Sequence, residues 1–352
     1  GLYASYGNVT SNGTLPNDGD KYSRNTISLR GNAKWNKLAV DVSINYARKD
    51  VRRTEQMEME LLQHAVDVDY SAMKNYNDER YNLDNYYTYY ATNPYWMIDN
   101  NYYLYQDNHT YGKIEASYEL VKGLKATGRI GGDFLNYNRE NINAKTSFTP
   151  GSYSDLGGAT PQNGYYSNYR FNRDQLDATA FVTADYKISD FTIGGTAGWN
   201  LNQRTYSYNG GYVNGLDVPG WYNLQNTTSA AVSEQYTNRK RLIGLFGQAE
   251  VGYKDFLYLN LSARNDWSST LPLDKNSYFY GGANLSLIFT ELFPTLKSNK
   301  IDFLKLRGAI GQTGNDTDPY FTSSWYTPLT STTFYYTRLP IGGVSGLSEN
   351  NR

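Results

Sequence analysis

The residues able to carry chemistry are few in this chain, and their spacing forms no catalytic pattern. The sequence contains no Cys and only two His, His64 and His109. Protein zinc sites gather several Cys or His ligands, so neither a thiolate site nor a His-rich cluster is expected. The chain also lacks a His-Glu-x-x-His helix motif, a Gly-x-Ser-x-Gly elbow and a Gly-rich phosphate loop. We therefore predict no catalytic residue, no metal, no cofactor and no enzymatic activity.

Charged residues instead recur at even spacing within segments of alternating polarity. Successive side chains of a strand point to opposite faces, so residues two or four apart share a face. A charge on a lipid-facing position near the centre of a membrane costs about 2–4 kcal/mol. If these segments span a membrane, their charges must face a polar interior. Two interpretations stay open, namely pairing within the wall or with a plug, and direct contact with a solute. The residues predicted to line this interior are Arg129, Asp133, Arg264, Asp266, Lys305 and Arg307.

Aromatic residues are the compositional extreme of the chain, with 36 Tyr, 13 Phe and 6 Trp among 352 residues. Tyr and Trp suit boundaries where one end of the ring is dry and the other is wet. Their clusters between the predicted strands are candidates for binding a solute. The alternative is that the same rings pack the loops into a rigid collar. The candidates are Tyr95, Trp96, Tyr165, Tyr166, Trp221 and Tyr222.

Charge and hydropathy exclude several classes of function. The 33 Lys and Arg nearly balance the 34 Asp and Glu, and the basic residues do not gather with aromatics along a stripe. We therefore predict no nucleic-acid partner. No apolar run approaches the roughly 18 residues that indicate a transmembrane helix.

The elements that must position these residues are strands. Leu257, Leu259 and Leu261 alternate with Tyr258 and Asn260, and similar alternation recurs along the chain. Several segments reach ten residues, whereas ordinary strands centre on about 5–6 and membrane strands need about 9–11. We predict eleven strands, near 1–9, 22–35, 38–49, 110–120, 124–138, 173–187, 190–206, 239–253, 256–267, 277–289 and 304–313.

The predicted connections alternate between short turns and long loops, a feature of outer-membrane barrels with short periplasmic turns and long extracellular loops. Aromatic residues also collect toward both ends of the strands, as in the girdles of such barrels. We predict an all-β fold, a transmembrane antiparallel β-barrel, with residues 1–352 as one fragment of the barrel domain. The chain starts at Gly1 in what reads as a strand, so we expect a piece of a longer protein. The long loops are predicted near 50–109, 139–172, 207–238 and 314–352.

Three parts of the chain carry a resemblance to a known family. Residues 304–315, Leu-Lys-Leu-Arg-Gly-Ala-Ile-Gly-Gln-Thr-Gly-Asn, resemble the characteristic strand of SusC/RagA-type TonB-dependent transporters. Residues 263–269, Ala-Arg-Asn-Asp-Trp-Ser-Ser, resemble the Arg-x-Asp-x-Ser-Ser stretch of that family, one strand pair earlier. Asn93-Pro94-Tyr95, followed by 107–118, is similar to its approach to a barrel strand. The order of these segments agrees with the family.

The resemblance implies a barrel of about 22 strands, of which this chain would form roughly half. It implies a plug domain that is absent from this chain and that contacts TonB. A SusD-like surface lipoprotein would act as a lid, and oligosaccharides or oligopeptides would be imported across the outer membrane, energised by TonB, ExbB and ExbD. Two alternatives from other classes stay open. One is a passive porin or an adhesin on a similar barrel. The other is a soluble extracellular carbohydrate-binding β protein.

Overall fold

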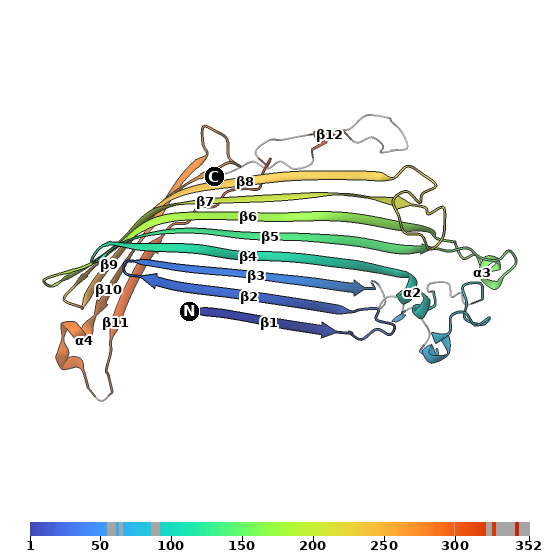
Figure 1. Ribbon diagram of the computed structural model, residues 1–352, viewed down its shortest axis with the longest axis horizontal. Helices are drawn as coiled ribbons and strands as arrows, with labels where there is room; N and C mark the ends of the chain where they lie inside the picture. The colour runs from blue at the N-terminus through green and yellow to red at the C-terminus, as the bar shows by residue number, and fades with distance from the viewer. Residues whose placement is uncertain are drawn as a thin grey trace.

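The computed structural model describes residues 1–54, 61–62, 66–85, 92–298 and 300–321, together with the backbone of 326–328 and 342–344. Its main element is an antiparallel sheet of eleven strands, arranged in chain order so that each strand pairs with its neighbours in sequence (Figure 1). The predicted all-β fold is confirmed, and this sheet contains the eleven predicted strands. The strands are β1 (Leu2–Ser11), β2 (Tyr22–Trp35), β3 (Leu38–Arg53), β4 (Asn101–Val121), β5 (Leu124–Lys145), β6 (Asn163–Ile188), β7 (Phe191–Asn214), β8 (Val232–Tyr253), β9 (Leu257–Ser268), β10 (Ser277–Ile288) and β11 (Lys305–Gly311).

Short helices and a small hairpin complete the described part of the chain. In that part, no helix has both the length and the apolar character needed to cross a membrane. The hairpin pairs β12 with β13, apart from the main sheet. These elements are η1 (Tyr70–Lys74), α2 (Pro94–Asn100), α3 (Tyr153–Leu156), α4 (Phe289–Leu292), η2 (Pro294–Leu296), β12 (Tyr326–Pro328) and β13 (Gly342–Val344).

The two ends of the sheet differ in how they connect the strands. Tight turns join β2 to β3, β4 to β5, β6 to β7 and β8 to β9 at one end, on the left in Figure 1. These turns place Asn36, Ser189, Lys254 and Asp255 at positive φ, between 47° and 58°. Asn and Asp accept this left-handed geometry more readily than most residues. The longer loops, with α2 and α3, lie at the opposite end, which confirms the predicted alternation.

Strand register divides the sheet into two faces of opposite character. Val42 lies beside Ile114, which lies beside Ile130, and equivalent rows continue through β11. Because neighbouring partners share a face, the apolar residues form one continuous apolar belt. We name this side the belt face and the opposite side the polar face. Exposed members of the apolar belt are Ile27, Leu29, Ile44, Ile114, Ile130, Val182, Ile193, Leu245, Val251, Leu259, Leu261, Leu285, Leu306 and Ile310.

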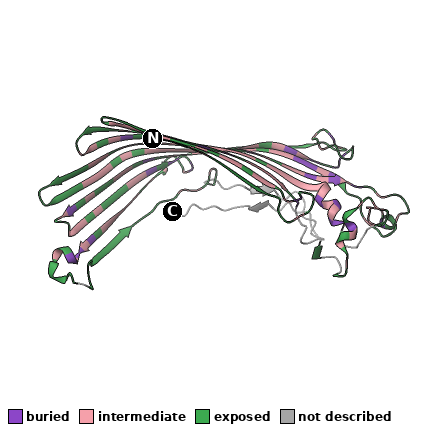
Figure 2. Cartoon of the chain, turned by 60° about the horizontal axis from the view of Figure 1, so that its bottom comes forward, coloured by how far each residue is buried: buried purple, intermediate pink, exposed green. Residues whose placement is uncertain are grey.

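Aromatic side chains border the apolar belt at two heights. Trp35 and Phe191 lie on the belt face beside the short turns, whereas Tyr46, Trp199 and Trp267 lie on the same face toward the long loops. All five are exposed. Buried residues form only short stretches of the strands, coloured purple in Figure 2. This sheet is therefore a wall rather than half of a conventional two-layer core.

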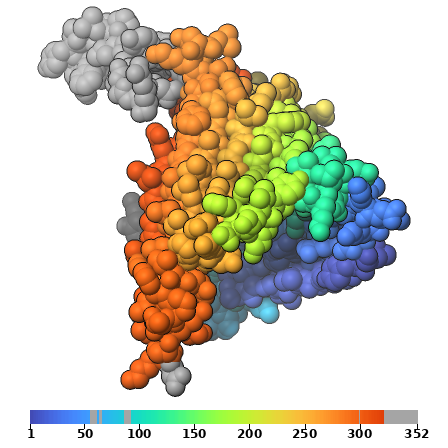
Figure 3. Space-filling view, turned by 90° about the vertical axis from the view of Figure 1, so that its left-hand side faces the viewer, coloured from blue at the N-terminus to red at the C-terminus, as the bar shows by residue number. Residues whose placement is uncertain are grey.

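The strands curve round instead of forming a flat sheet. Figure 3 views the molecule from the short-turn end, where the colours run in order from the N-terminal strands to the C-terminal strands around an arc. Each neighbouring pair from β1 to β11 keeps an antiparallel register. Strand twist of a fixed hand accumulates across such a sheet and bends it into part of a cylinder.

On the long-loop side, the predicted central strands end several residues before the observed ones. The loops predicted near 50–109, 139–172 and 207–238 are reduced to residues 54–100, 146–162 and 215–231, because β4 to β8 extend further. Past the aromatic border, both faces carry polar or aromatic side chains, so the alternation of dry and wet residues fades in the sequence. Backbone pairing continues there nevertheless, with Tyr102 opposite Ile142 and Tyr166 opposite Val213. Most of the loop predicted at 314–352 lies outside the described residues.

Candidate functional site on the polar face

All six residues predicted to line an interior lie on the polar face. Register pairs Arg129 with Glu115, and Asp133 with Tyr111, on the side opposite the apolar belt. Arg264 lies beside Tyr280, and Arg307 beside Ser286, on the same side of β9 to β11. The period-two alternation in the sequence therefore predicted correctly that these residues lie on the face opposite the apolar belt. Their contact with a plug or a solute stays a prediction.

Charges in the middle of the polar face neutralise one another. The Arg129 Nε group donates to Glu115 at 2.7 Å. Lys113 lies 3.3 Å from Glu115 and 3.4 Å from Asp41, which links three strands. These side chains remain partly exposed, so solvent screens the ion pairs and each contributes little to folding stability. The arrangement gives a hydrated wall with balanced charge.

A tighter ion pair lies on β9. The Arg264 Nε group donates to Asp266 at 2.8 Å, and the Tyr280 hydroxyl donates to the same carboxylate at 2.6 Å. Asp266 is only 2% exposed, so its charge depends on these partners. Gly244 on β8 leaves the space for them, since a Cβ there would lie 2.3 Å from the Arg264 guanidinium. The Arg-x-Asp spacing in residues 263–269 thus forms a structural clamp.

The loop after β11 is attached to the strands by Asp316. Its carboxylate pairs with Lys240 on β8 and accepts hydrogen bonds from Ser268 and Thr270. Burial opposes ionisation of Asp316, but these donors hold its pKa below the ordinary value. Gly314 packs so closely on Tyr278 that a Cβ would lie 2.5 Å from the ring. Asp316, which directly follows the family-like segment 304–315, therefore contacts the other family-like segment, 263–269, through its hydrogen bond with Ser268.

Lys305 and Arg307 have no such attachment. Both are exposed on β11, and within the residues that the structure describes neither forms an ion pair. β11 is also the last strand of the described sheet, so one side of it has no neighbouring strand there.

The polar face changes character toward the long loops. His109 and Asp133 form a 2.8 Å contact and line a pocket of about 490 Å³. Arg173 and Arg204 line the same pocket, together with Gln175 and Tyr206 from the polar face. Asp133 was predicted as an interior residue from sequence, whereas the two arginines were missed.

An aromatic cluster continues from this pocket toward the loop end. The rings of Tyr137 and Phe171 are stacked, with centroids 4.7 Å apart, and the rings of Tyr208 and Tyr236 are stacked at 5.6 Å. The Arg139 guanidinium lies 5.0 Å from the Tyr137 centroid. We name this group the tyrosine–arginine platform. It comprises Tyr105, Tyr137, Phe171, Tyr206, Tyr208, Tyr236, Arg139 and Arg173.

Sequence reasoning missed the tyrosine–arginine platform because the strand predictions stopped too early. A signal was present: aromatic or basic residues recur at every second position in Tyr137-x-Arg139, Phe171-x-Arg173 and Arg204-x-Tyr206-x-Tyr208. Within a strand this spacing places each pair on one face. Register then aligns the strands, with Phe171 opposite both Tyr137 and Tyr208.

The six aromatic candidates from the sequence do not converge on one surface. Tyr166 and Tyr222 contact each other with centroids 6.4 Å apart, and Tyr166 is buried in a cluster with Ile142, Val213 and Leu216. Burial raises the pKa of the Tyr222 hydroxyl. This cluster forms at the outer end of the belt face, where it packs the β7–β8 loop against the strands.

The other aromatic candidates differ in exposure. Trp96 on α2 is buried, and Tyr95 beside it is half-buried. Tyr165 lies on the polar face, where its ring stacks on that of Tyr212 at 5.8 Å. Trp221 is 48% exposed and is the most accessible of these candidates in the β7–β8 loop. A binding role for the six stays a prediction.

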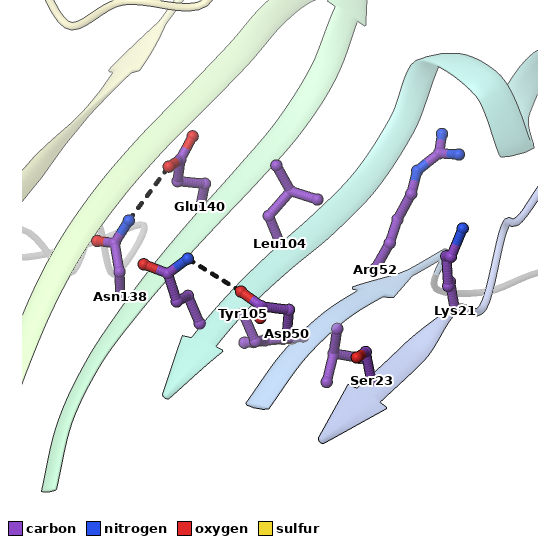
Figure 4. Close-up of a pocket in the computed structure, with 10 residues that line it drawn as sticks. Lys21, Ser23, Asp50, Arg52, Leu104, Tyr105, Asn138 and Glu140 are labelled. Carbon is purple, nitrogen blue, oxygen red and sulfur yellow. Dashed lines mark hydrogen bonds between the residues drawn. The ribbon is translucent and has the colours of Figure 1, made fainter. Parts of the chain in front are cut away.

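A second pocket, of about 360 Å³, lies on the belt face beyond the apolar belt (Figure 4). Its polar groups are mostly engaged with one another. Gln106 donates to Asp50 at 2.9 Å, and Asn138 donates to Glu140 at 3.1 Å. Arg52 donates to the Ile98 carbonyl at 2.9 Å, which holds the end of α2. We interpret this pocket as the attachment of the loops to the strands.

Comparison with known proteins supports the architecture. The sequence matches no model of a protein family and no curated protein. Among solved structures, 98% of the chain superimposes on the RagAB peptide transporter, with a TM-score of 0.73 and 16% identity. The RagAB peptide importer in its "open-open" state gives a TM-score of 0.74 with 17% identity, again over 98% of the chain. The chain has the fold of part of a TonB-dependent transporter barrel. It spans 38% and 37% of the lengths of these two chains.

Proposed function

We propose that this chain is part of the barrel wall of a TonB-dependent nutrient importer in the bacterial outer membrane. The observation that carries the proposal is the apolar belt, which continues across eleven neighbouring strands and is bordered by aromatic rings at two heights. Exposed apolar side chains in an unbroken belt of this kind suit contact with lipid hydrocarbon. The polar face would then line the interior of the barrel.

A longer protein would close this wall. Unpaired backbone groups at β1 and β11 are too costly in hydrocarbon, so additional strands must pair with them in a membrane. The family-like segments and the likeness to RagAB support a SusC/RagA-type architecture. In that architecture a plug domain occupies the barrel and contacts TonB, and a SusD-like surface lipoprotein covers its outer end.

Import would proceed without covalent chemistry. The lid and the long loops would enclose an oligosaccharide or oligopeptide, and TonB, driven by ExbB and ExbD, would pull on the plug to open a path. The middle of the polar face would act as a fixed, hydrated wall, because its charges neutralise one another within the sheet. Recognition would take place nearer the long loops, where the polar face carries rings and unpaired arginines.

Uptake in whole cells tests this function. We expect the full-length protein to fractionate with outer membranes and to need detergent for extraction. Deleting its gene should abolish accumulation of labelled oligopeptides or oligosaccharides, and so should an uncoupler that collapses the inner-membrane proton gradient.

The contrary results identify the alternatives. Accumulation that persists after the uncoupler would indicate a passive porin, and binding to surfaces without accumulation would indicate an adhesin. Recovery of the protein in aqueous buffer without detergent would indicate a soluble carbohydrate-binding protein.

A further inference from the structure

Three arginines on the polar face lie in a row near the long-loop end without an anionic partner. Arg139 and Arg173 both lie beside the Tyr137 ring, at 5.0 and 6.0 Å. Arg173 and Arg204 line one pocket of about 490 Å³. All three side chains are exposed. Within the residues that the structure describes, no carboxylate forms an ion pair with any of them.

Acidic groups on this part of the polar face are already engaged elsewhere. They have side-chain partners of their own, so within the residues that the structure describes none of them is an ion-pair partner of the three guanidinium groups. Asp174, which follows Arg173 directly, also lines this pocket, but its side chain belongs to the opposite face because side chains alternate along β6. The engaged pairs are Asp107 with Lys49, Asp133 with His109, Asp177 with Asn200, and Glu234 with Tyr169.

Aromatic rings hold two of these arginines in place. The Arg139 guanidinium lies 5.4 Å from the Tyr105 centroid and 5.5 Å from that of Phe171, and Arg173 lies 5.6 Å from that of Tyr206. A guanidinium that stacks on a ring keeps its N–H donors at the edge free for a second partner. Because the side chain is already ordered, less entropy is lost when a carboxylate binds.

The rings of the tyrosine–arginine platform cover one another. Phe171 stacks on Tyr137 and contacts Tyr206 and Tyr208, while Tyr208 stacks on Tyr236. Sugar recognition by stacking needs an open ring face, and the central Tyr137 and Phe171 rings cover each other, whereas Tyr236 at the edge of the platform remains 39% exposed. The surface instead offers hydroxyl groups, ring edges and guanidinium groups, which favours recognition of charge over recognition of a sugar ring.

We propose that Arg139, Arg173 and Arg204 bind the carboxylate groups of acidic oligopeptides on their way into the barrel. The inference rests on the proposed import function and specifies its substrate. Each guanidinium can donate two parallel hydrogen bonds to a carboxylate, a geometry that strengthens and orients the contact. The row extends from β5 to β7 and so presents several such positions to an extended peptide.

Binding to the purified full-length protein, in complex with its lid if one co-purifies, provides the test. The probes are two synthetic peptides with amidated C-termini, Ala-Glu-Ala-Glu and Ala-Gln-Ala-Gln, which differ only in charge. We expect the Glu peptide to bind at least about tenfold more tightly, since charge-assisted hydrogen bonds are stronger than neutral ones. Its affinity should fall as salt is raised, because ions screen exposed charges.

Variants at single positions assign the effect to the row. Arg173→Gln and Arg204→Gln should each weaken binding of the Glu peptide by about tenfold and leave binding of the Gln peptide unchanged. Arg173→Lys retains the charge and should recover part of the loss. Arg170→Gln is the matched control, because Arg170 is exposed on the belt face of the same strand, and it should change neither affinity.

The outcomes separate this inference from the proposed function. Equal affinity for the two peptides, or equal losses in Arg170→Gln and Arg173→Gln, would overturn the acidic specificity. Binding of an oligogalacturonate in preference to the Glu peptide would overturn the choice of a peptide. In either case, TonB-dependent accumulation of another solute would still support the proposed import function. If cells accumulated no solute in a TonB-dependent way, the import function itself would be rejected.

Discussion

The belt face and the polar face of this sheet are built from alternate residues of the same strands, and one ion pair on each face shows how differently the two can be buried. On the belt face, Arg48 forms an ion pair with Asp50, and the two side chains are 48% and 42% exposed. On the polar face, Arg264 pairs with Asp266, whose side chain is only 3% exposed. The first pair lies beyond the apolar belt and is open to water, whereas neighbouring strands enclose the second. Environment, rather than the type of residue, therefore decides what a charge contributes to each face.

The largest expected effect comes from removing one partner of the enclosed pair. Arg264→Gln should lower the free energy of unfolding by about 3–5 kcal/mol, because Asp266 would remain buried with an uncompensated charge. Arg48→Gln should lower it by less than about 1 kcal/mol, since exposed pairs contribute little. Urea titration of the full-length protein in lipid vesicles measures both values. Similar losses in the two variants would contradict the contrast between the faces.

A charge introduced into the apolar belt tests which face contacts lipid. Leu261→Arg should destabilise the membrane-inserted protein by about 2–4 kcal/mol, because Leu261 is exposed in the middle of the belt on β9. Ser262→Arg, one residue along and on the polar face, is the matched control and should have little effect. The measurement is again unfolding in lipid vesicles. A larger loss for the Ser262 variant would reverse the assignment of the two faces.

The smallest effect is a pH dependence at the outer end of the polar face. The folded pKa of Asp316 lies below its ordinary value of 3.8, so its attachment contributes stability above that value and loses it as the pH falls through the folded pKa. Asp316→Asn should remove this dependence and cost about 1–2 kcal/mol of local stability at neutral pH.

Amide hydrogen exchange measures the Asp316 effect locally. Protection of residues 312–318 should decrease as the pH falls from about 3.8 through the lower folded pKa of Asp316, once the intrinsic rate of exchange is taken into account. The β7–β8 loop, attached through Asn226 and backbone groups rather than through an ionised carboxylate, serves as the internal reference. Equal changes in the two loops would show that Asp316 is not the titrating group.

The sequence predicted the part of the fold that depends on alternation. Where one face is uniformly apolar, as in Leu257, Leu259 and Leu261, period two is visible residue by residue, and the strand and both its faces could be assigned. The predictions failed at the outer ends of β4 to β8, where neither face is dry and the pattern becomes mixed. The tyrosine–arginine platform lies in that region, so it was missed.

The aromatic candidates show a second limit of sequence reasoning. Composition identified Tyr-rich segments, but Tyr166 and Trp96 are buried while Trp221 is exposed. Tyr serves equally well in packing and in recognition, and its residue type does not separate the two roles. Register was needed to place Tyr137 beside Phe171 and Arg173 on one face.

The amino-acid order alone determined the strands across the apolar belt, the face on which each charge lies, and the alternation of short turns with long loops. These features follow from local geometry, because every second side chain of a strand shares a face. Tertiary structure alone decided which charges are neutralised, which rings are covered and how the segments 263–269 and 304–315 meet near Asp316. Those features depend on register between strands far apart in the chain. Register sets the distances between side chains on different strands, and these distances cannot be derived from the spacing of residues along one strand.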